Sequence, residues 1–332
     1  MYPWQVSQWQ QIMQRTSLPH ALLLRGHAGN GKVDFAHALS RSLLCAQPVN
    51  THACNICAGC TWFNEGAHPD FKMISPEDND NDDESIDLSK KKTSKKSQIS
   101  VSQIRQLSDY LHLSNHQTNG RRIVLIAPAE LLNIASSNAL LKMLEEPPAN
   151  TIFLLVSSQP QRLLPTIMSR CQVIEMPIPN SSVALDWLTK QGLKDAKKLL
   201  EYAGGAPLLA VQMSQENGAV EKIINHLALG AKLEPLLTAT AMLQIGMERS
   251  IETLQKWIFD LTICIHAQKI HYHVAHTKPL QLLCKSVNLK SLLSFQQKLL
   301  EYKKTANHPL SNEMQLENIL LNYTKIFSKK IE

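Results

Sequence analysis

Four of the chain's seven cysteines fall within sixteen residues of one another, and their spacing is typical of a metal site. Two thiolates separated by two residues can meet one tetrahedral ion, with zinc–sulfur distances of about 2.3 Å. Four thiolates fill the coordination shell and leave no position for water, so a zinc ion here would be structural. The predicted ligands are Cys45, Cys54, Cys57 and Cys60.

Two other interpretations of the cysteine cluster stay open at this point. A C-x-x-C-x-x-C run also occurs in iron–sulfur ligation, although Asn64 follows here and no Cys-Pro pair does. The thiols could also carry no metal. His52 and His68 are reserve ligands that we expect at the surface. The odd cysteine count predicts no disulfides, and the remaining thiols, expected singly in the core, are Cys171, Cys264 and Cys284.

A glycine-rich turn near the start of the chain matches the G-x-x-x-x-G-K pattern of phosphate-binding loops. Glycines let backbone N–H groups point into such a loop, and the helix that follows adds its positive end. The lysine would reach the outer phosphates. The candidate phosphate-binding residues are Gly26, Gly29, Gly31 and Lys32.

Two positions that would hold magnesium in a nucleotide hydrolase carry no suitable oxygen. Val33 stands where the pattern has Ser or Thr, and Ala127-Pro128 follow a predicted strand where a hydrolase has Asp or Asp-Glu. Glu130 lies three residues on, and we expect it to point elsewhere. The sequence therefore predicts no intrinsic ATPase and no magnesium. Whether the loop is empty or binds nucleotide through Lys32 without hydrolysis stays open.

The elements around these residues alternate between short apolar strands and helices. This order predicts a parallel sheet with helices on both faces. No convincing strand follows residue 181, and the pattern is helical to the end. The expected strands are 21–25, 71–74, 123–126, 152–156 and 171–176, and the expected helices include 1–20, 32–44, 101–113, 129–146, 162–169, 182–188, 194–202 and 208–213.

Three domains follow from this pattern and from a break at two prolines. We expect a nucleotide-binding-like domain over 1–177, with the cysteine module at 45–60 and a flexible insertion at 77–98. The insertion is acidic and then lysine-rich, as solvated loops are. A small helical domain would span 178–217, and a helical C-terminal domain would span 218–332.

Composition argues against a membrane protein and against a secreted one. The formal net charge is +6, which fits a phosphate-bearing partner only weakly. No stretch reaches the about 18 apolar residues of a membrane span, and the first residues lack the features of a secretory signal. We expect a cytoplasmic protein without a membrane partner. Because no dense basic stripe with interleaved aromatics occurs, we expect weak DNA binding by the isolated chain.

Three motifs together resemble the clamp-loader branch of the AAA+ ATPases. They are Ser137-Asn-Ala-Leu-Leu-Lys-Met-Leu-Glu-Glu-Pro-Pro148, Phe153-Leu-Leu-Val-Ser-Ser158 and Ser169-Arg-Cys171. The resemblance covers about residues 1–215, including the cysteine module. It implies an α/β plus all-α chain: an AAA+ parallel-sheet domain with an inserted zinc module, a small helical lid domain and a helical C-terminal collar domain.

The resemblance also implies partners and a role. Clamp loaders are pentameric rings in which gamma/tau motor subunits and a delta subunit load a sliding clamp onto primed DNA, within a polymerase holoenzyme. Arg170 matches the arginine that completes a neighbour's ATP site in trans. Ser158 falls at a polar sensor position, whereas Leu208 replaces a second sensor arginine. The resemblance thus implies a non-hydrolysing subunit that activates its neighbour.

Other interpretations remain. Arg170 could be a solvated side chain ahead of a strand. The chain could be an active AAA+ ATPase, which hydrolysis abolished by Lys32→Ala would establish. It could also be a zinc-dependent DNA-binding protein, which salt-sensitive DNA binding lost on Cys57→Ser would favour.

Overall fold

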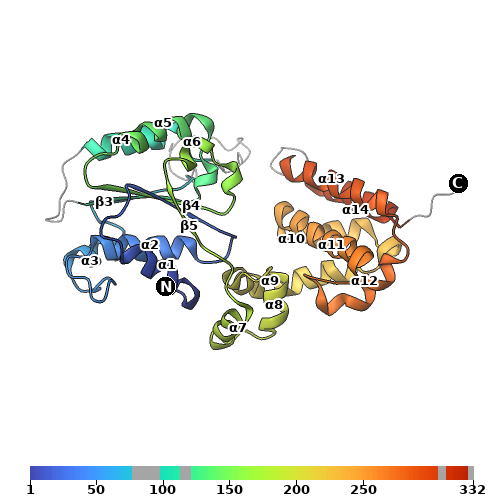
Figure 1. Cartoon of the computed structure of the whole chain (residues 1–332). Helices are drawn as coiled ribbons and strands as arrows, with labels where there is room; N and C mark the ends of the chain where they lie inside the picture. Colours follow the sequence, from blue (N-terminus) through green and yellow to red (C-terminus); the bar gives the residue numbers. More distant parts are fainter. Residues whose placement is uncertain (77–97, 113–120, 306–311, 328–332) are drawn as a thin grey trace, which may run out of the picture. The chain divides into compact units, whose positions relative to one another are not determined.

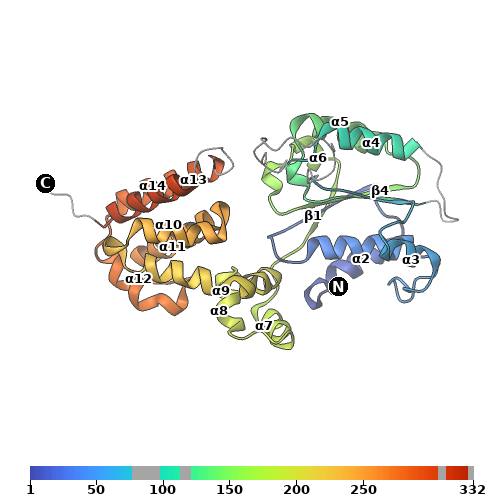
Figure 2. The same ribbon diagram turned by 180° about the vertical axis from the view of Figure 1, so that it is seen from behind.

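The computed structural model describes residues 1–76, 98–112, 121–305 and 312–327. The chain divides into two compact units, residues 1–183 and 184–332, which are described separately below (Figures 1 and 2). The predicted insertion 77–98 lies, apart from Gln98, outside the described residues. Within the described ranges, no helix is both long enough and apolar enough to cross a bilayer.

Unit 1 is built on a five-stranded sheet in which every pair of neighbouring strands is parallel, as predicted. The strand order is β2-β3-β4-β1-β5. Ala21 lies opposite Phe153, which places the phosphate-loop strand β1 between β4 and β5. The strands are β1 (Ala21–Arg25), β2 (Phe71–Ile74), β3 (Arg122–Ile126), β4 (Thr151–Ser157) and β5 (Gln172–Glu175).

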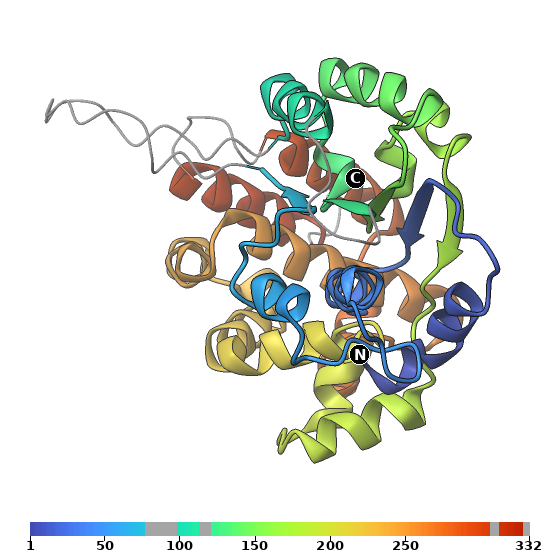
Figure 3. The ribbon, with the colours of Figure 1, turned by 90° about the vertical axis from the view of Figure 1, so that its left-hand side faces the viewer.

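Side chains that alternate along the central strands form two hydrophobic cores, one on each face of the sheet. On one face, Leu23 and Phe153 pack with α4 (Val101–His112), α5 (Ile134–Glu145) and α6 (Pro165–Met168). On the other face, residues such as Leu22 and Leu154 pack with α1 (Val6–Met13) and α2 (Lys32–Leu44). Figure 3 shows the two helical layers of unit 1 on either side of the strands. Burial on both faces explains why these strands are almost wholly apolar.

Several helices of unit 1 are shorter than the periodicity predicts. The expected helix 129–146 is a 3-10 turn (Ala129–Leu131) followed by α5. Asn133 divides the two, because its side-chain oxygen accepts a hydrogen bond from Ser136 N at 2.8 Å and caps α5. The expected helix 1–20 is likewise a 3-10 turn (Pro3–Gln5) and α1, and the expected helix 162–169 is only α6 preceded by a 3-10 turn at Pro160–Arg162.

Unit 2 is helical throughout its described residues, as predicted. Its short 3-10 turns are Gly230–Lys232 and Val274–His276. The α-helices, the first of which begins at the end of unit 1, are α7 (Ser181–Lys190), α8 (Ala196–Tyr202), α9 (Pro207–Leu227), α10 (Pro235–Ile245), α11 (Met247–Ala267), α12 (Thr277–Cys284), α13 (Leu289–Thr305) and α14 (Asn312–Lys325).

Helix α9 is longer than the sequence predicted. A short helix was expected over 208–213, but the helix continues to Leu227. Gly218 does not end it, since a glycine inside a helix costs only about 1 kcal/mol relative to alanine. The border predicted between 217 and 218 therefore falls inside one helix, and the division into three domains stays a prediction.

Candidate functional site

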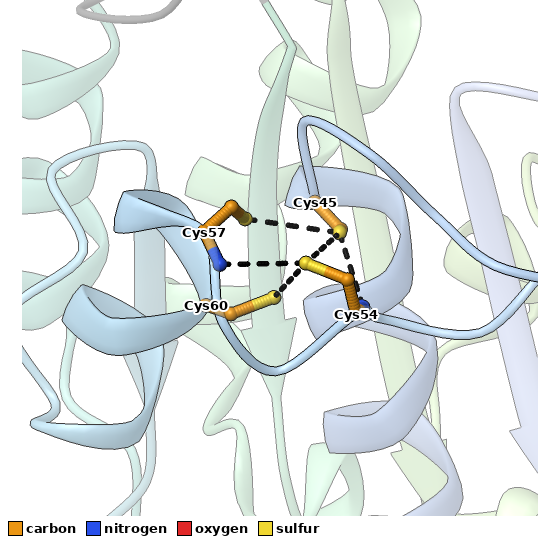
Figure 4. A group of neighbouring side chains, drawn as sticks. All are labelled: Cys45, Cys54, Cys57 and Cys60. Carbon is orange, nitrogen blue, oxygen red and sulfur yellow. Dashed lines mark hydrogen bonds between the residues drawn. The ribbon is translucent and has the colours of Figure 1, made fainter.

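The four clustered cysteines are placed by the ends of two helices. Cys45 is the residue that follows α2, and Cys57 is the N-cap of α3 (Ala58–Asn64). Cys60 lies in the first turn of α3, and Cys54 comes from the loop between the helices. Figure 4 shows the four thiols pointing toward one common centre.

The sulfur–sulfur distances fit a tetrahedral thiolate site. The Sγ atom of Cys54 lies 3.5 Å from that of Cys45 and 3.9 Å from that of Cys60, and Cys45 and Cys57 are 3.8 Å apart. All four lie within 4.8 Å of one another. Sulfurs about 2.3 Å from a tetrahedral zinc would be about 3.8 Å apart. The cluster could thus hold a metal such as zinc.

The electrostatics of the cluster favour thiolates at two of its positions. Hydrogen bonds from the backbone N–H groups of Ile56 and Cys57 lower the pKa of Cys54. Burial opposes ionisation of Cys57, yet hydrogen bonds from backbone and neighbouring thiols lower its pKa to about 6. Burial raises the pKa of Cys60 to about 12. A divalent cation would supply the charge that lets all four ionise.

The two histidines considered as reserve ligands make other contacts. His52 is exposed, as expected, and its ring stacks on Trp9 at 4.6 Å between centroids. The expectation that His68 is a surface residue is wrong, because it is 4% exposed. Its Nδ1 accepts a hydrogen bond from Asp70 N at 3.1 Å, so the turn before β2 buries it.

The loop that matches the phosphate-binding pattern has glycines in left-handed backbone conformations. It joins β1 to α2, and Gly29 and Gly31 have φ of 79° and 76°, a region that favours glycine. A Cβ on Gly31 would also lie 2.4 Å from the Tyr2 ring. Gly26 is held equally closely, since a Cβ there would lie 2.1 Å from the Met176 carbonyl oxygen.

The chain's own groups occupy the polar positions of this loop. Lys32 Nζ donates a hydrogen bond to His27 O at 2.6 Å. Gln5 Nε2 donates to the carbonyl oxygens of Asn30 (3.0 Å) and Gly31 (2.8 Å). The roles of Tyr2 and Gln5 were not predicted, because no sequence pattern links an N-terminal turn to a loop some 25 residues on.

Lys32 is 4% exposed, and this burial lowers the pKa of its ammonium to about 8. The negative charge of Glu130 partly opposes this shift, and the expectation that Glu130 points elsewhere stays a prediction. Its Oε1 accepts a hydrogen bond from Ser158 N at 3.1 Å, which ties the 3-10 turn after β3 to the end of β4.

The two positions expected to lack metal-binding oxygens carry the apolar side chains of Val33 and Ala127. Val33 lies in the first turn of α2 with an exposed side chain, and Ala127 is buried directly after β3. Neither side chain has a donor atom for magnesium. The loop therefore has positive-φ glycines at positions 29 and 31, and neither Val33 nor Ala127 offers a ligand to magnesium.

Arg170 lies between α6 and β5, away from any strand interior, with a side chain that is 35% exposed. Its Nη2 forms an ion pair with Glu145 Oε1 at 2.6 Å, and its Nη1 donates to Thr166 O at 2.9 Å. The sequence did not indicate the Glu145 contact, since Glu145 ends α5 and Arg170 lies beyond α6.

Comparison with known proteins gives a consistent result. A family model described as "DNA polymerase III, delta subunit" matches residues 2–180. A DNA polymerase III subunit delta' from Pseudomonas aeruginosa is 32% identical over 280 residues, covering 83% of this chain and 79% of the relative. The same subunit from Yersinia pestis is 34% identical over 277 residues, covering 79% and 75%.

Among solved structures, a DNA polymerase III gamma subunit-related protein from Thermotoga maritima aligns with 98% of this chain and 100% of its own. The TM-score is 0.46 and the identity is 18%.

Proposed function

Because the chain belongs to the family of DNA polymerase III delta-prime subunits, we propose that it is a clamp-loader subunit that does not hydrolyse ATP. In this proposal it stands beside an ATP-binding motor subunit and inserts Arg170 into that neighbour's site. The zinc ion that the four cysteines could hold would be structural.

The observation that carries the proposal is a phosphate-type loop without metal ligands. Phosphoryl transfer depends on positioning and on neutralising charge with magnesium. Val33 and Ala127 supply no ligand, and Lys32 already donates to His27 O. Such a loop keeps the fold of a nucleotide-binding domain but lacks the groups for hydrolysis.

The exposure of Arg170 supports its role in trans. Its guanidinium lies at the surface of unit 1, where the side chain is 35% exposed. An arginine supplied by a neighbour stabilises the charge that develops on the transferred phosphoryl group and contributes about 10³–10⁵ in rate in well-studied NTPases.

The partners in this proposal follow from the family. They are the gamma/tau motor subunits and the delta subunit of a pentameric ring, with the sliding clamp and primed DNA engaged by the assembly. Any polymerase activity belongs to other subunits of the holoenzyme.

The proposal is tested in a reconstituted loader that contains either wild-type chain or Arg170→Ala. We expect single-turnover hydrolysis at the one neighbouring site to slow by about 10³-fold, with assembly unchanged by gel filtration. Arg162→Ala is the matched control, since Arg162 is also exposed and lies in the turn after β4.

An unchanged rate with Arg170→Ala would limit the chain to a scaffold and remove the role in trans. Hydrolysis by the isolated chain that disappears with Lys32→Ala would instead make it an active ATPase.

A further inference from the structure

The guanidinium of Arg170 is not free to turn toward a neighbour. Three acceptors hold it: Thr166 O and Ser169 Oγ accept from Nη1 at 2.9 and 3.4 Å, and Glu145 Oε1 is 2.6 Å from Nη2. Two of these acceptors come from the residues just before Arg170. Only Glu145 comes from another element, the last residue of α5.

The Glu145 contact affects the donors that a phosphate would use. A guanidinium binds phosphate through two adjacent N–H groups, and Nη2 contributes to both of its two-nitrogen edges. With Nη1 turned to Thr166 and Ser169, one edge is already engaged. A carboxylate on Nη2 therefore competes directly with a phosphate for the remaining donors and neutralises their charge.

The position of Glu145 indicates that the contact is not there to stabilise the helix. A carboxylate in the last turn of a helix faces the negative end of the helix dipole, which is unfavourable. Glu145 is 49% exposed, so its pair with Arg170 is a solvated one and contributes little to folding. A variant that removes this charge should fold normally.

We propose that Glu145 is a positioning residue that holds Arg170 in a resting conformer until the phosphate of a neighbour's ATP replaces it. This rests on the proposed role of Arg170 in trans. Phosphate carries more charge than one carboxylate and accepts two hydrogen bonds from the fork, so it displaces a half-exposed partner readily. The ion pair thus restrains the neighbour's hydrolysis before the clamp and DNA are engaged.

The test is the ATPase rate of the reconstituted loader with Glu145→Gln, measured without and with clamp and primed DNA. Releasing a solvated ion pair should raise the basal rate roughly two- to fivefold. The rate with clamp and DNA should stay the same, because Arg170 then already contacts phosphate. Glu146→Gln is the matched control: it removes the adjacent exposed carboxylate and should leave both rates unchanged.

The variants separate this inference from the function on which it rests. In an Arg170→Ala background, Glu145→Gln should have no effect on the basal rate. An increase that persists there, an equal increase with Glu146→Gln, an unchanged basal rate, or a fall in rate would each overturn the role of Glu145. If Arg170→Ala alone changes nothing, the proposed function itself fails.

Discussion

At the scale of single residues, the loop between β1 and α2 keeps some residues of the phosphate-binding pattern and lacks others. Gly29 and Gly31 preserve the turn, and Lys32 preserves the charge. The Lys32 ammonium is engaged inside the loop, where its Nζ donates a hydrogen bond to His27 O. Val33 then removes the oxygen that would hold magnesium. The loop thus keeps its glycine turn, and Val33 offers no ligand to magnesium.

The buried ammonium of Lys32 predicts a specific pH dependence of stability. Its pKa is lowered from 10.5 to about 8 in the folded chain. Between these values the unfolded chain binds more protons, so the free energy of unfolding of unit 1 should rise with pH from about 8 to 10.5. Urea denaturation of wild type and Lys32→Met at several pH values measures this.

In that comparison Lys32→Met removes the titrating group and keeps the aliphatic volume. The wild type should gain stability relative to Lys32→Met as the pH rises through this window. A constant difference between the two chains from pH 7 to 10.5 would contradict a buried, perturbed lysine.

At the scale of elements, little apolar packing holds the loop of the cysteine module. The loop from Cys45 to Cys57 contributes few core side chains, and residues such as Val49 and Ile56 are exposed. Two helix ends and four thiols hold it. A metal bound by the four thiols would therefore supply folding energy to this segment.

We predict one zinc ion per chain and its loss with Cys54→Ser. Without the fourth ligand the loop loses its constraint, so protease should cut within residues 45–64 at least tenfold faster. Metal analysis and limited proteolysis of protein purified without chelator measure both effects. Cys171→Ala, which removes a buried thiol outside the cluster, should keep the zinc.

Absence of zinc from the wild-type protein, or an iron signal in its place, would contradict this assignment. An unchanged digestion pattern with Cys54→Ser would show that packing alone holds the module.

Helix α9 shows how one element can serve two cores. Ala210 and Met213 near its start pack with α7 and α8, whereas Ile223 and Leu227 near its end pack with α10, α11 and α14. Periodicity could find both apolar stripes. It could not show that one continuous helix carries them.

At the scale of the whole molecule, each unit has its own core. The largest cluster of unit 2 surrounds Trp257 and Tyr323, both fully buried. Trp257 Nε1 donates to Tyr323 OH at 2.8 Å, and that hydroxyl donates to Leu227 O at 2.7 Å. One hydroxyl thus links α9, α11 and α14 and satisfies two buried polar groups.

Tyr323→Phe should destabilise unit 2 by about 2–4 kcal/mol, because it leaves the Trp257 N–H and the Leu227 carbonyl unpaired in the core. Hydrogen exchange should accelerate in α9 to α14 and stay unchanged in β1 to β5. Tyr302→Phe, which alters a partly exposed hydroxyl, should change stability by no more than about 0.5 kcal/mol. Equal acceleration in both units would contradict separate cores.

Local sequence patterns predicted the features that depend on residues close together in the chain. Strands such as 21–25 and 152–156 were identified because burial on both faces requires continuous apolar runs. The cysteine cluster was identified because zinc ligation constrains spacing, and the glycine turn because only glycine suits its backbone. The missing metal ligands could also be read directly, since they are residue types at known offsets.

Only the tertiary structure decided contacts between distant segments. Three contacts join residues that no local period relates: the Gln5 hydrogen bonds to the loop, the hydrogen bond from Ser158 N to Glu130, and the Glu145–Arg170 ion pair. Polar partners of this kind are chosen by which groups the packed elements bring within about 3 Å. That choice depends on the paths of whole helices and strands, so the sequence pattern of either partner alone could not reveal it.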